Sequence, residues 1–243
     1  MSHTPTDAVC AHVRDNNGVL AGIERRALIR LAHRIPRRIN SDHLSALGLS
    51  AMAVTGLSFA AFVLTPWAAW GVVLSLAFNW LGDSLDGTLA RVRGHQRPRY
   101  GYYVDHAIDL AGATLLMTGL AFSGLMSPLI AAAVLAAYLL VSAETYLATH
   151  SRGVFRMAVF GFGPTELRIL LSIGTLQLLR SPYVSIAGHR WLLFDVGGAI
   201  AITALLVTFI VAAVATGRLL YRQEPLPARQ RPPLRFEELQ SEA

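Results

Sequence analysis

Six long apolar runs, separated by short polar stretches, alternate along this chain. They cover residues 44–65, 67–82, 104–125, 128–148, 165–179 and 191–215. Each approaches the roughly 20 residues that an α-helix needs to cross the apolar core of a bilayer. The fifth run is short in apolar residues because Glu166 and Arg168 lie in its first turns. The pattern predicts an all-α polytopic membrane protein with six transmembrane helices.

The segments outside these runs differ in character. Residues 18–38 alternate apolar side chains with arginines, which predicts an amphipathic helix in the membrane interface rather than a span. Residues 1–17 are polar and are expected to be flexible. Residues 223–243 combine prolines with charges and are expected to form a disordered tail. A six-helix transmembrane catalytic domain is therefore expected over residues 40–222.

Composition supports this class and excludes others. Hydrophobic residues make up 53% of the chain and charged residues 15%, and the mean hydropathy is +0.46, values outside those of ordinary soluble domains. All 21 basic residues are arginine, and the net charge is +6. Because these arginines flank apolar runs, anionic lipid head groups are the expected partners, and no nucleic acid is expected. The single Cys10 excludes an intrachain disulfide.

The distribution of arginine predicts the orientation in the membrane. Arginines gather in the N-terminal segment, in the loop after the second run, between the fourth and fifth runs, and in the C-terminal tail. Only Arg180 and Arg190 fall on the opposite side. Since short cytoplasmic loops are enriched in positive charge, both termini and the loop after the second run are expected to be cytoplasmic.

Four aspartates stand beside the second and third apolar runs, Asp83, Asp86, Asp105 and Asp109. An ionised group near the bilayer centre costs at least about 2.5 kcal/mol, so cations, water or function must compensate such a cluster. On helices, Asp83 and Asp86 would share one face, and Asp105 and Asp109 would form a second stripe. A short hairpin would bring the two stripes together on the cytoplasmic side.

Four facing carboxylates would repel one another, which predicts bound hard cations. Oxygen ligands favour Mg²⁺ or Mn²⁺, with Ca²⁺ as a competitor. Gly87, Ala90 and Gly101 have almost no side chain and leave room for a ligand beside the helix backbones. The guanidinium of Arg91 suits a phosphate.

These residues resemble the signature of the CDP-alcohol phosphotransferase family. The signature covers 27 residues, and eight fixed positions match. It reads Asp83-x-x-Asp86-Gly87-x-x-Ala90-Arg91, nine further residues, and Gly101-x-x-x-Asp105-x-x-x-Asp109. The resemblance implies a homodimer of six-helix protomers, a pair of divalent metals, a CDP moiety in the cleft and an active site open to lipid.

The resemblance also implies a reaction and roles for these residues. A CDP-alcohol, here expected to be CDP-diacylglycerol, would lose CMP to the hydroxyl of a small polar alcohol in one displacement. All four aspartates would ligate metal, and Asp109 would also remove the proton of the acceptor hydroxyl. The nucleotide and its diphosphate would bind at five positions: Asp83, Gly87, Ala90, Arg91 and Gly101.

The acceptor alcohol is expected where the fourth and fifth runs meet. Candidate contacts there are Glu144, Arg152, Arg156, Glu166 and Arg168. Arginines at these positions suit a phosphorylated acceptor. Arg152 and Arg156 fit equally well as positive charges on the cytoplasmic side. The alternative for Glu166 and Arg168 is that each pairs with a charged residue on another helix.

Other functions stay open at this point. Residues 163–166, Gly-Pro-Thr-Glu, resemble a segment of the choline and ethanolamine phosphotransferase branch, in which diacylglycerol accepts the head group of a CDP-aminoalcohol. More distant alternatives are a membrane prenyltransferase, which also holds Mg²⁺ and diphosphate with aspartates, and a cation transporter. The sequence leaves open both alcohols, the choice between Mg²⁺ and Mn²⁺, the dimer interface, and the role of His106.

Overall fold

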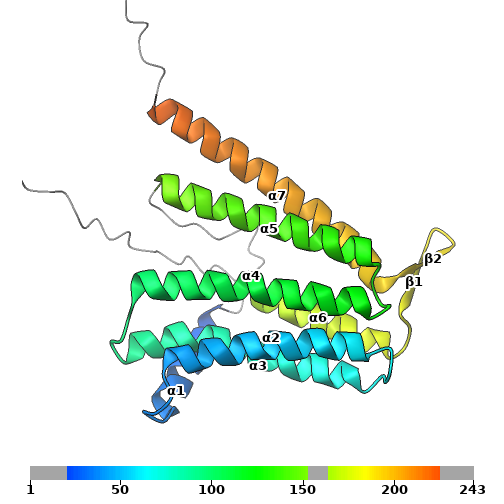
Figure 1. The fold of residues 1–243 in the computed structure, drawn as a ribbon, viewed down its shortest axis with the longest axis horizontal. Helices are drawn as coiled ribbons and strands as arrows, with labels where there is room; N and C mark the ends of the chain where they lie inside the picture. Colours follow the sequence, from blue (N-terminus) through cyan, green and yellow to red (C-terminus); the bar gives the residue numbers. More distant parts are fainter. Residues whose placement is uncertain (1–20, 153–163, 225–243) are drawn as a thin grey trace, which may run out of the picture.

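Long helices lying side by side form most of the protein in this computed structural model, which describes residues 21–152 and 164–224 (Figure 1). The elements are α1 (Ala21–Arg34), α2 (Ser41–Ala61), α3 (Ala68–Val92), α4 (Pro98–Phe122), α5 (Pro128–Arg152), α6 (Pro164–Leu178), β1 (Tyr183–Ile186), β2 (His189–Leu192) and α7 (Leu193–Gln223). Helices α2 to α7 each overlap one of the six predicted runs, and α3 and α7 extend beyond theirs to Val92 and Gln223. The expected flexible N-terminus and disordered tail lie outside the described residues, apart from the last residues of α7.

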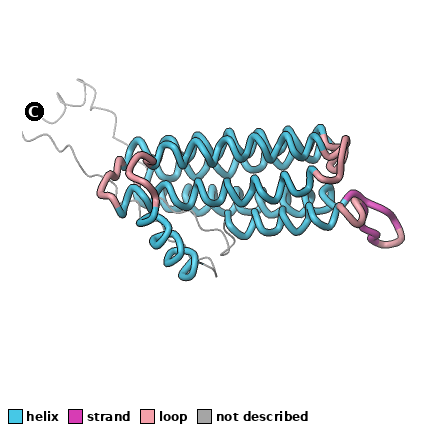
Figure 2. The backbone as a smooth tube through the Cα atoms, turned by 90° about the horizontal axis from the view of Figure 1, so that it is seen from below, coloured by secondary structure: helices cyan, strands magenta, loops and turns pink. Residues whose placement is uncertain are grey.

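The prediction of an all-α chain is wrong in one place. Strands β1 and β2 form an antiparallel hairpin in which Val184 pairs with Trp191. The turn at its tip contains Ala187 and Gly188, both with positive φ, 50° and 81°. Two such residues in sequence make the kind of tight turn that matches the twist of the paired strands. The hairpin protrudes from the end of the bundle opposite α1 (Figure 2).

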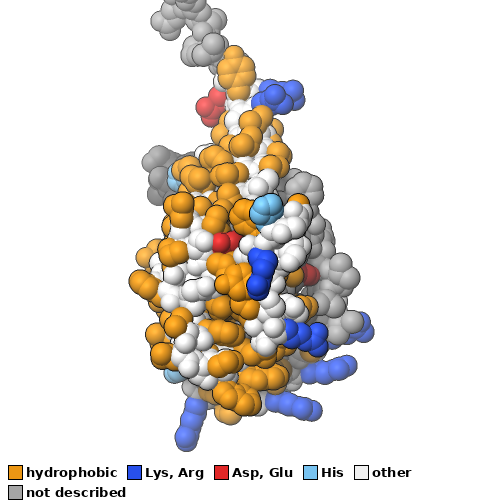
Figure 3. Space-filling model, turned by 90° about the vertical axis from the view of Figure 1, so that its right-hand side faces the viewer, with side chains coloured by type: hydrophobic (Ala, Val, Ile, Leu, Met, Phe, Trp, Pro, Cys, Tyr) orange, Lys and Arg blue, Asp and Glu red, His pale blue; other side chains and the backbone are white. Residues whose placement is uncertain are grey.

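Three of the described helices are long and apolar enough to cross a membrane: α2, α5 from Pro128 to Ser151, and α7. That α3, α4 and α6 also cross the membrane, which would make six spans, stays a prediction. Helices α3 and α4 carry the charged motif residues, and α6 has only 15 residues. Seen from the hairpin end, apolar side chains cover most of the visible surface (Figure 3). Together these features describe an integral membrane protein.

Each helix of the bundle packs against its neighbours, and α2 lies between α3 and α4. Helix α2 contacts α3 on one side and α4 on the other, α3 contacts α6, α4 contacts α5, and α5 contacts α7. The main core lies toward the hairpin end, where Phe59, Leu76, Leu120 and Phe194 are buried together. Helix α7 diverges from the other helices toward its C-terminal end (Figure 1).

Glycines lie where the backbones of α3 and α4 come very close to the backbone of α2. A Cβ atom at Gly82 of α3 would lie 2.6 Å from the Leu44 carbonyl oxygen and 2.7 Å from the Gly48 nitrogen of α2. On the other side of α2, a Cβ atom at Gly119 of α4 would overlap the backbone of Gly56. Small residues let helix backbones approach where lipid supplies no hydrophobic driving force. Both neighbours of α2 are thus held close to it.

Helix α1 lies across the end of the bundle that carries the loop between α3 and α4 (Figure 2). Its buried Leu28 and Ala32 pack with Leu85 and Leu89 of α3. The guanidinium of Arg93 donates to carbonyl oxygens in the connection after α1, those of Ile35 at 2.8 Å and Pro36 at 3.1 Å. A helix thus lies within the segment for which an interfacial amphipathic helix was predicted, and its place in the membrane interface stays a prediction.

At the opposite end, Asp195 lies at the start of α7. Its carboxylate accepts from the Ser127 nitrogen at 2.6 Å and from the Ser127 hydroxyl at 2.5 Å. Ser127 directly precedes α5, so Asp195 caps that helix and ties α5 to α7.

We expect Gly119→Ala to destabilise the protein by about 1–3 kcal/mol, because the new methyl group would force α4 away from the backbone of Gly56. The midpoint of thermal unfolding in mild detergent measures this. The matched control is Gly217→Ala on α7, where a Cβ atom would meet nothing within 4 Å. That control should be neutral or stabilising by about 0.5–1 kcal/mol. Equal effects of the two substitutions would contradict the close crossing.

Candidate active site

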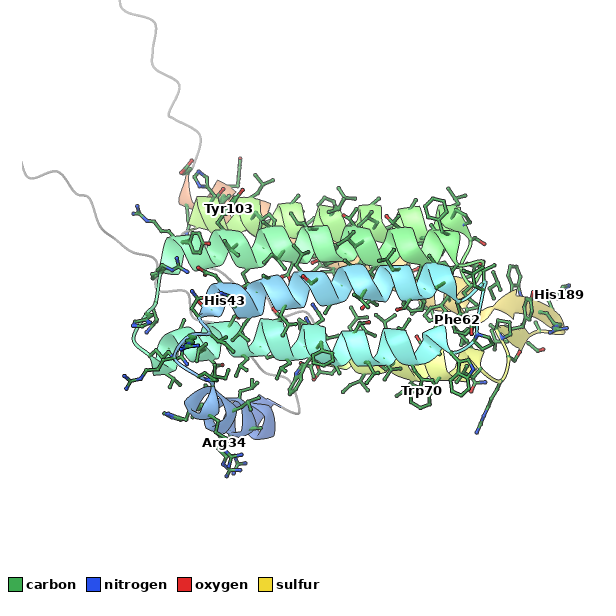
Figure 4. The ribbon with its side chains drawn as sticks, turned by 60° about the horizontal axis from the view of Figure 1, so that its bottom comes forward. Arg34, His43, Phe62, Trp70, Tyr103 and His189 are labelled. Carbon is green, nitrogen blue, oxygen red and sulfur yellow. The ribbon has the colours of Figure 1, made fainter. Side chains whose placement is uncertain are left out.

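The four motif aspartates lie on the two helices that flank α2. Asp83 and Asp86 are on the second half of α3, and Asp105 and Asp109 are on the first half of α4. All four are partly buried. This end of the bundle also carries Arg34, His43 and Tyr103, whereas Phe62, Trp70 and His189 mark the other end (Figure 4).

The two stripes approach each other across the edge of α2. Asp86 lies within electrostatic range of both Asp83 and Asp105. Asp109, one turn further along α4, lies within electrostatic range of Tyr138 and Tyr146 on α5. The site is therefore bounded by α2, α3, α4 and α5.

Asp83 is paired with Arg168 from the first turns of α6. The Nη2 atom of Arg168 donates to Oδ2 of Asp83 at 2.7 Å, and Nε of Arg168 donates to Oδ1 of Asn79 at 2.7 Å. Asn79 is buried, and its amide nitrogen donates to the Gly48 carbonyl oxygen of α2 at 2.9 Å. One polar network thus joins α2, α3 and α6 at the first motif carboxylate.

Asp86 is held from the other side, by α2. The hydroxyl of Ser45 donates to Oδ2 of Asp86 at 2.6 Å. Ser45 also lies 3.2 Å from the Ser41 carbonyl oxygen in the preceding turn. The serine therefore fixes the side-chain orientation of the second motif carboxylate.

The side chains of the motif are chemically suited to bind a divalent metal ion. The motif supplies four carboxylates, the oxygen ligands that Mg²⁺ and Mn²⁺ prefer. Within residues 21–152 and 164–224, however, no three acidic, histidine or cysteine side chains converge as the ligands of one ion would. Asp83 and Asp86 are instead oriented by Arg168 and Ser45.

Gly87 and Gly101, two of the small motif residues, have few atoms near the position of a Cβ. At Gly87 the nearest atoms to a Cβ would belong to the guanidinium of Arg91, the closest at 3.4 Å, and at Gly101 nothing would lie within 4 Å. Arg91 is exposed and donates to the Thr88 hydroxyl at 3.1 Å. Its guanidinium therefore runs back along α3 and lies beside Gly87.

A cavity of about 320 Å³ opens next to these residues, between the start of α2 and the end of α3. Its lining is mostly polar and basic and includes Ala90 of the motif. The lining residues are Asn40, Ser41, Asp42, Leu89, Ala90, Arg93, His95, Gln96 and Arg97. Arg97 forms an ion pair with Asp42 across this cavity, which connects the loop before α4 to the start of α2.

His106 is a packing residue between α4 and α5. Its ring lies 4.1 Å from the Tyr102 ring and 5.1 Å from the Tyr146 ring, between centroids, and its Nδ1 atom lies 2.8 Å from the Tyr102 carbonyl oxygen. The ring is buried. It thereby supports the helix that carries Asp105 and Asp109.

Of the expected acceptor residues, Glu144 and Arg168 each bind a side chain of another helix. Glu144 accepts from the Thr216 hydroxyl of α7 at 3.0 Å, and Arg168 binds Asp83. Glu166 is partly buried in the first turn of α6. Arg152 is the last residue of α5, and Arg156 lies outside the described residues.

Sequence reasoning overlooked Ser45 and Asn79. Asn79 stands four residues before Asp83, so it shares the face of α3 that carries the motif. An asparagine within an apolar run, on the same helix face as Asp83, could have been recognised as part of the site. Ser45 had no such signal, because its link to Asp86 spans 41 residues of sequence.

The fold and the site together define an integral membrane protein with a carboxylate-lined site at one end of a helix bundle. The chain belongs to the CDP-alcohol phosphatidyltransferase family, whose family model matches residues 44–217. The resemblance predicted from the motif is thereby confirmed. The chain is a CDP-alcohol phosphotransferase, an enzyme of phospholipid synthesis.

Among solved structures, the chain is similar to a phosphatidylinositol phosphate synthase of Mycobacterium tuberculosis crystallised with CDP-DAG bound. The TM-score is 0.58 and the sequence identity is 20%, over 79% of this chain and 94% of that chain. At this identity the likeness shows the fold alone. Comparison with curated proteins finds no match.

We expect Ser45→Ala to lower kcat/KM about tenfold, because Asp86 would lose the hydroxyl that orients it. Release of CMP under initial-rate conditions measures this. Thr203→Ala is the control, since the Thr203 hydroxyl bonds only within its own helix, to the Ala199 carbonyl oxygen at 2.9 Å. Unchanged turnover in the Ser45 variant would remove its positioning role.

Proposed function

We propose that this enzyme transfers a phosphatidyl group from CDP-diacylglycerol to the hydroxyl of a small polar alcohol and releases CMP. The observation that carries the proposal is the pair of aspartate stripes on α3 and α4, with Gly87, Ala90 and Gly101 at the positions that the family signature requires. The related synthase was crystallised with CDP-DAG, which supports the same donor here.

In the proposed reaction, the acceptor oxygen bonds to the phosphorus attached to the diacylglycerol. The bond from this phosphorus to the oxygen it shares with the CMP phosphorus breaks, and CMP leaves. Asp109 takes the proton of the acceptor hydroxyl as general base. Arg91 binds a phosphate oxygen through its guanidinium. The space beside Gly87, Ala90 and Gly101 admits the nucleotide.

A divalent cation, Mg²⁺ or Mn²⁺, would be held by Asp83, Asp86, Asp105 and Asp109. When bound, it would neutralise the diphosphate and make CMP a better leaving group. The resemblance implies two such ions. Ser45 would then act on the metal site by orienting Asp86.

An apolar groove supports a lipid substrate. It has a volume of about 610 Å³, lies between α2 and α4, and begins at Leu110, next to the proposed base Asp109. Its lining residues are Leu49, Ser50, Ala53, Leu110, Ala111, Thr114 and Leu115. An acyl chain in this groove would place a lipid head group near the carboxylates.

The acceptor is proposed to bind near the end of α5 and the start of α6, where Glu144, Arg152, Arg156 and Glu166 remain candidates. A phosphorylated polyol suits the arginines, and the related structure is a phosphatidylinositol phosphate synthase. We further propose a homodimer, with both termini and the active site on the cytoplasmic side. The arginine distribution supports this orientation.

The alternative is transfer of a head group from a CDP-aminoalcohol to diacylglycerol. The segment Gly-Pro-Thr-Glu at residues 163–166, from which α6 begins, favours it. Purified enzyme with Mg²⁺ or Mn²⁺ should be given CDP-diacylglycerol, CDP-choline or CDP-ethanolamine, each with a panel of acceptors. Product and CMP with CDP-diacylglycerol alone would support the proposal. Turnover only with a CDP-aminoalcohol would establish the alternative, and failure with every donor would remove both.

We expect Asp109→Asn to reduce turnover by at least about a hundredfold, because the amide cannot accept the proton of the acceptor hydroxyl. Binding of CDP, measured by calorimetry, should be largely retained. The matched control is Asp195→Asn, at the opposite end of the bundle, whose carboxylate binds Ser127. That control should lower thermal stability but preserve turnover per folded molecule. Normal turnover of the Asp109 variant would refute the general-base role.

A further inference from the structure

We propose that Arg168 is a built-in counter-cation of the metal site: it neutralises Asp83 when no metal is bound and competes with the divalent metal for this carboxylate. The inference rests on the proposed function, because it takes the motif aspartates to be metal ligands. It gives Arg168 a role in positioning Asp83 and removes it from the candidate acceptor contacts.

The geometry of the ion pair supports this role. The pair is short, 2.7 Å from Nη2 to Oδ2, and the side chains of Arg168 and Asp83 are only 15% and 21% exposed. Water therefore screens this pair less than an ion pair on the surface. Arg168 is on α6 and Asp83 is on α3, so the ion pair joins two helices rather than neighbouring residues of one helix.

A second contact fixes the position of the guanidinium. Nε of Arg168 donates to Oδ1 of Asn79, and the amide nitrogen of Asn79 donates to the Gly48 carbonyl oxygen. Asn79 is 5% exposed, so this anchor is buried. Asn79, one helical turn before Asp83, thereby holds the guanidinium against this carboxylate with little further loss of side-chain freedom.

Charge balance explains why such a cation is useful. Asp86 lies within electrostatic range of both Asp83 and Asp105, and the repulsion between these carboxylates would be large in a membrane without a positive charge. Arg168 supplies one permanent charge, since a guanidinium stays protonated. A divalent cation that binds Asp83 would meet this charge at close range, so the arginine weakens metal binding while it stabilises the metal-free protein.

The test is Mn²⁺ binding to the purified full-length enzyme, measured by calorimetry without nucleotide. We expect Arg168→Gln to lower the Kd for Mn²⁺ about tenfold, because the competing charge is removed. In EDTA the variant should unfold at a lower temperature than the wild type, and added Mn²⁺ should raise its unfolding temperature by more. An unchanged or weaker affinity for Mn²⁺ would overturn the proposal.

Two further variants separate charge from structure. Arg168→Lys keeps the charge and should bind Mn²⁺ with nearly the wild-type Kd; tightening equal to that of the Gln variant would overturn the proposal. Arg180→Gln is the control for loss of an arginine, because Arg180 is exposed beyond the end of α6. It should leave the Kd unchanged.

A measurement on the wild type covers the case in which Arg168→Gln does not fold. Phenylglyoxal modifies accessible guanidinium groups, and mass spectrometry of peptides reports the modification of Arg168. We expect Mn²⁺ to increase this modification, because the metal releases the arginine from Asp83. Constant or reduced labelling would overturn the proposal.

The outcomes also distinguish this inference from the proposed function. If the wild type binds no divalent metal, both fail. If it binds metal with an affinity that Arg168→Gln does not raise, only the counter-cation fails. If the variant binds Mn²⁺ more tightly but no CDP-alcohol is turned over, the counter-cation stands and the proposed substrates fail.

Discussion

The close approach of α2 to both of its neighbours is the constraint on which the rest of the structure depends. Gly82 meets the backbone of α2 near Gly48 on one side, and Gly119 meets Gly56 on the other. Because apolar lipid offers no hydrophobic gain for helix association, contact between backbones has to supply the attraction through packing. The positions of these glycines determine how far apart α3 and α4 lie, and hence the distance across which the two aspartate stripes face each other.

The same contact places polar partners for the carboxylates. Gly82 directly precedes Asp83, so the backbone crossing and the first motif carboxylate occupy the same turn of α3. On the facing turns of α2, Ser45 reaches Asp86 and the Gly48 carbonyl oxygen receives the amide of Asn79. A wider crossing would break both hydrogen bonds and leave buried polar groups without partners, which is costly in an apolar environment. Packing and charge compensation therefore depend on one another here.

Much of the fold could be predicted from the apolar runs, because each run is long and its ends are marked by polar residues or proline. The motif stripes were equally accessible, since spacings of three and four residues place side chains on one face of a helix. The hairpin of β1 and β2 was not predicted, because it is short and lies between two apolar runs. An ion pair of Arg168 with another helix was predictable from its place in an apolar run, but the identity of its partner was not. Arg168 and Asp83 are 85 residues apart, and the pattern around each identifies a charged helix face but not its partner.

The helices that carry the chemistry differ from those best suited to lipid. Of the described helices, α2, α5 and α7 are long and apolar enough to cross a membrane, whereas α3, α4 and α6 carry Asp83, Asp105 and Arg168. A charged helix is costly to insert alone, and its cost falls when an opposite charge from another helix is already in place. The pair between α3 and α6 meets this need, while α2 contacts both charged motif helices and donates a hydrogen bond from Ser45 to Asp86. The proposed site needs its carboxylates available only when a divalent metal binds, so an internal cation lets the same helices remain stable in the membrane before that moment.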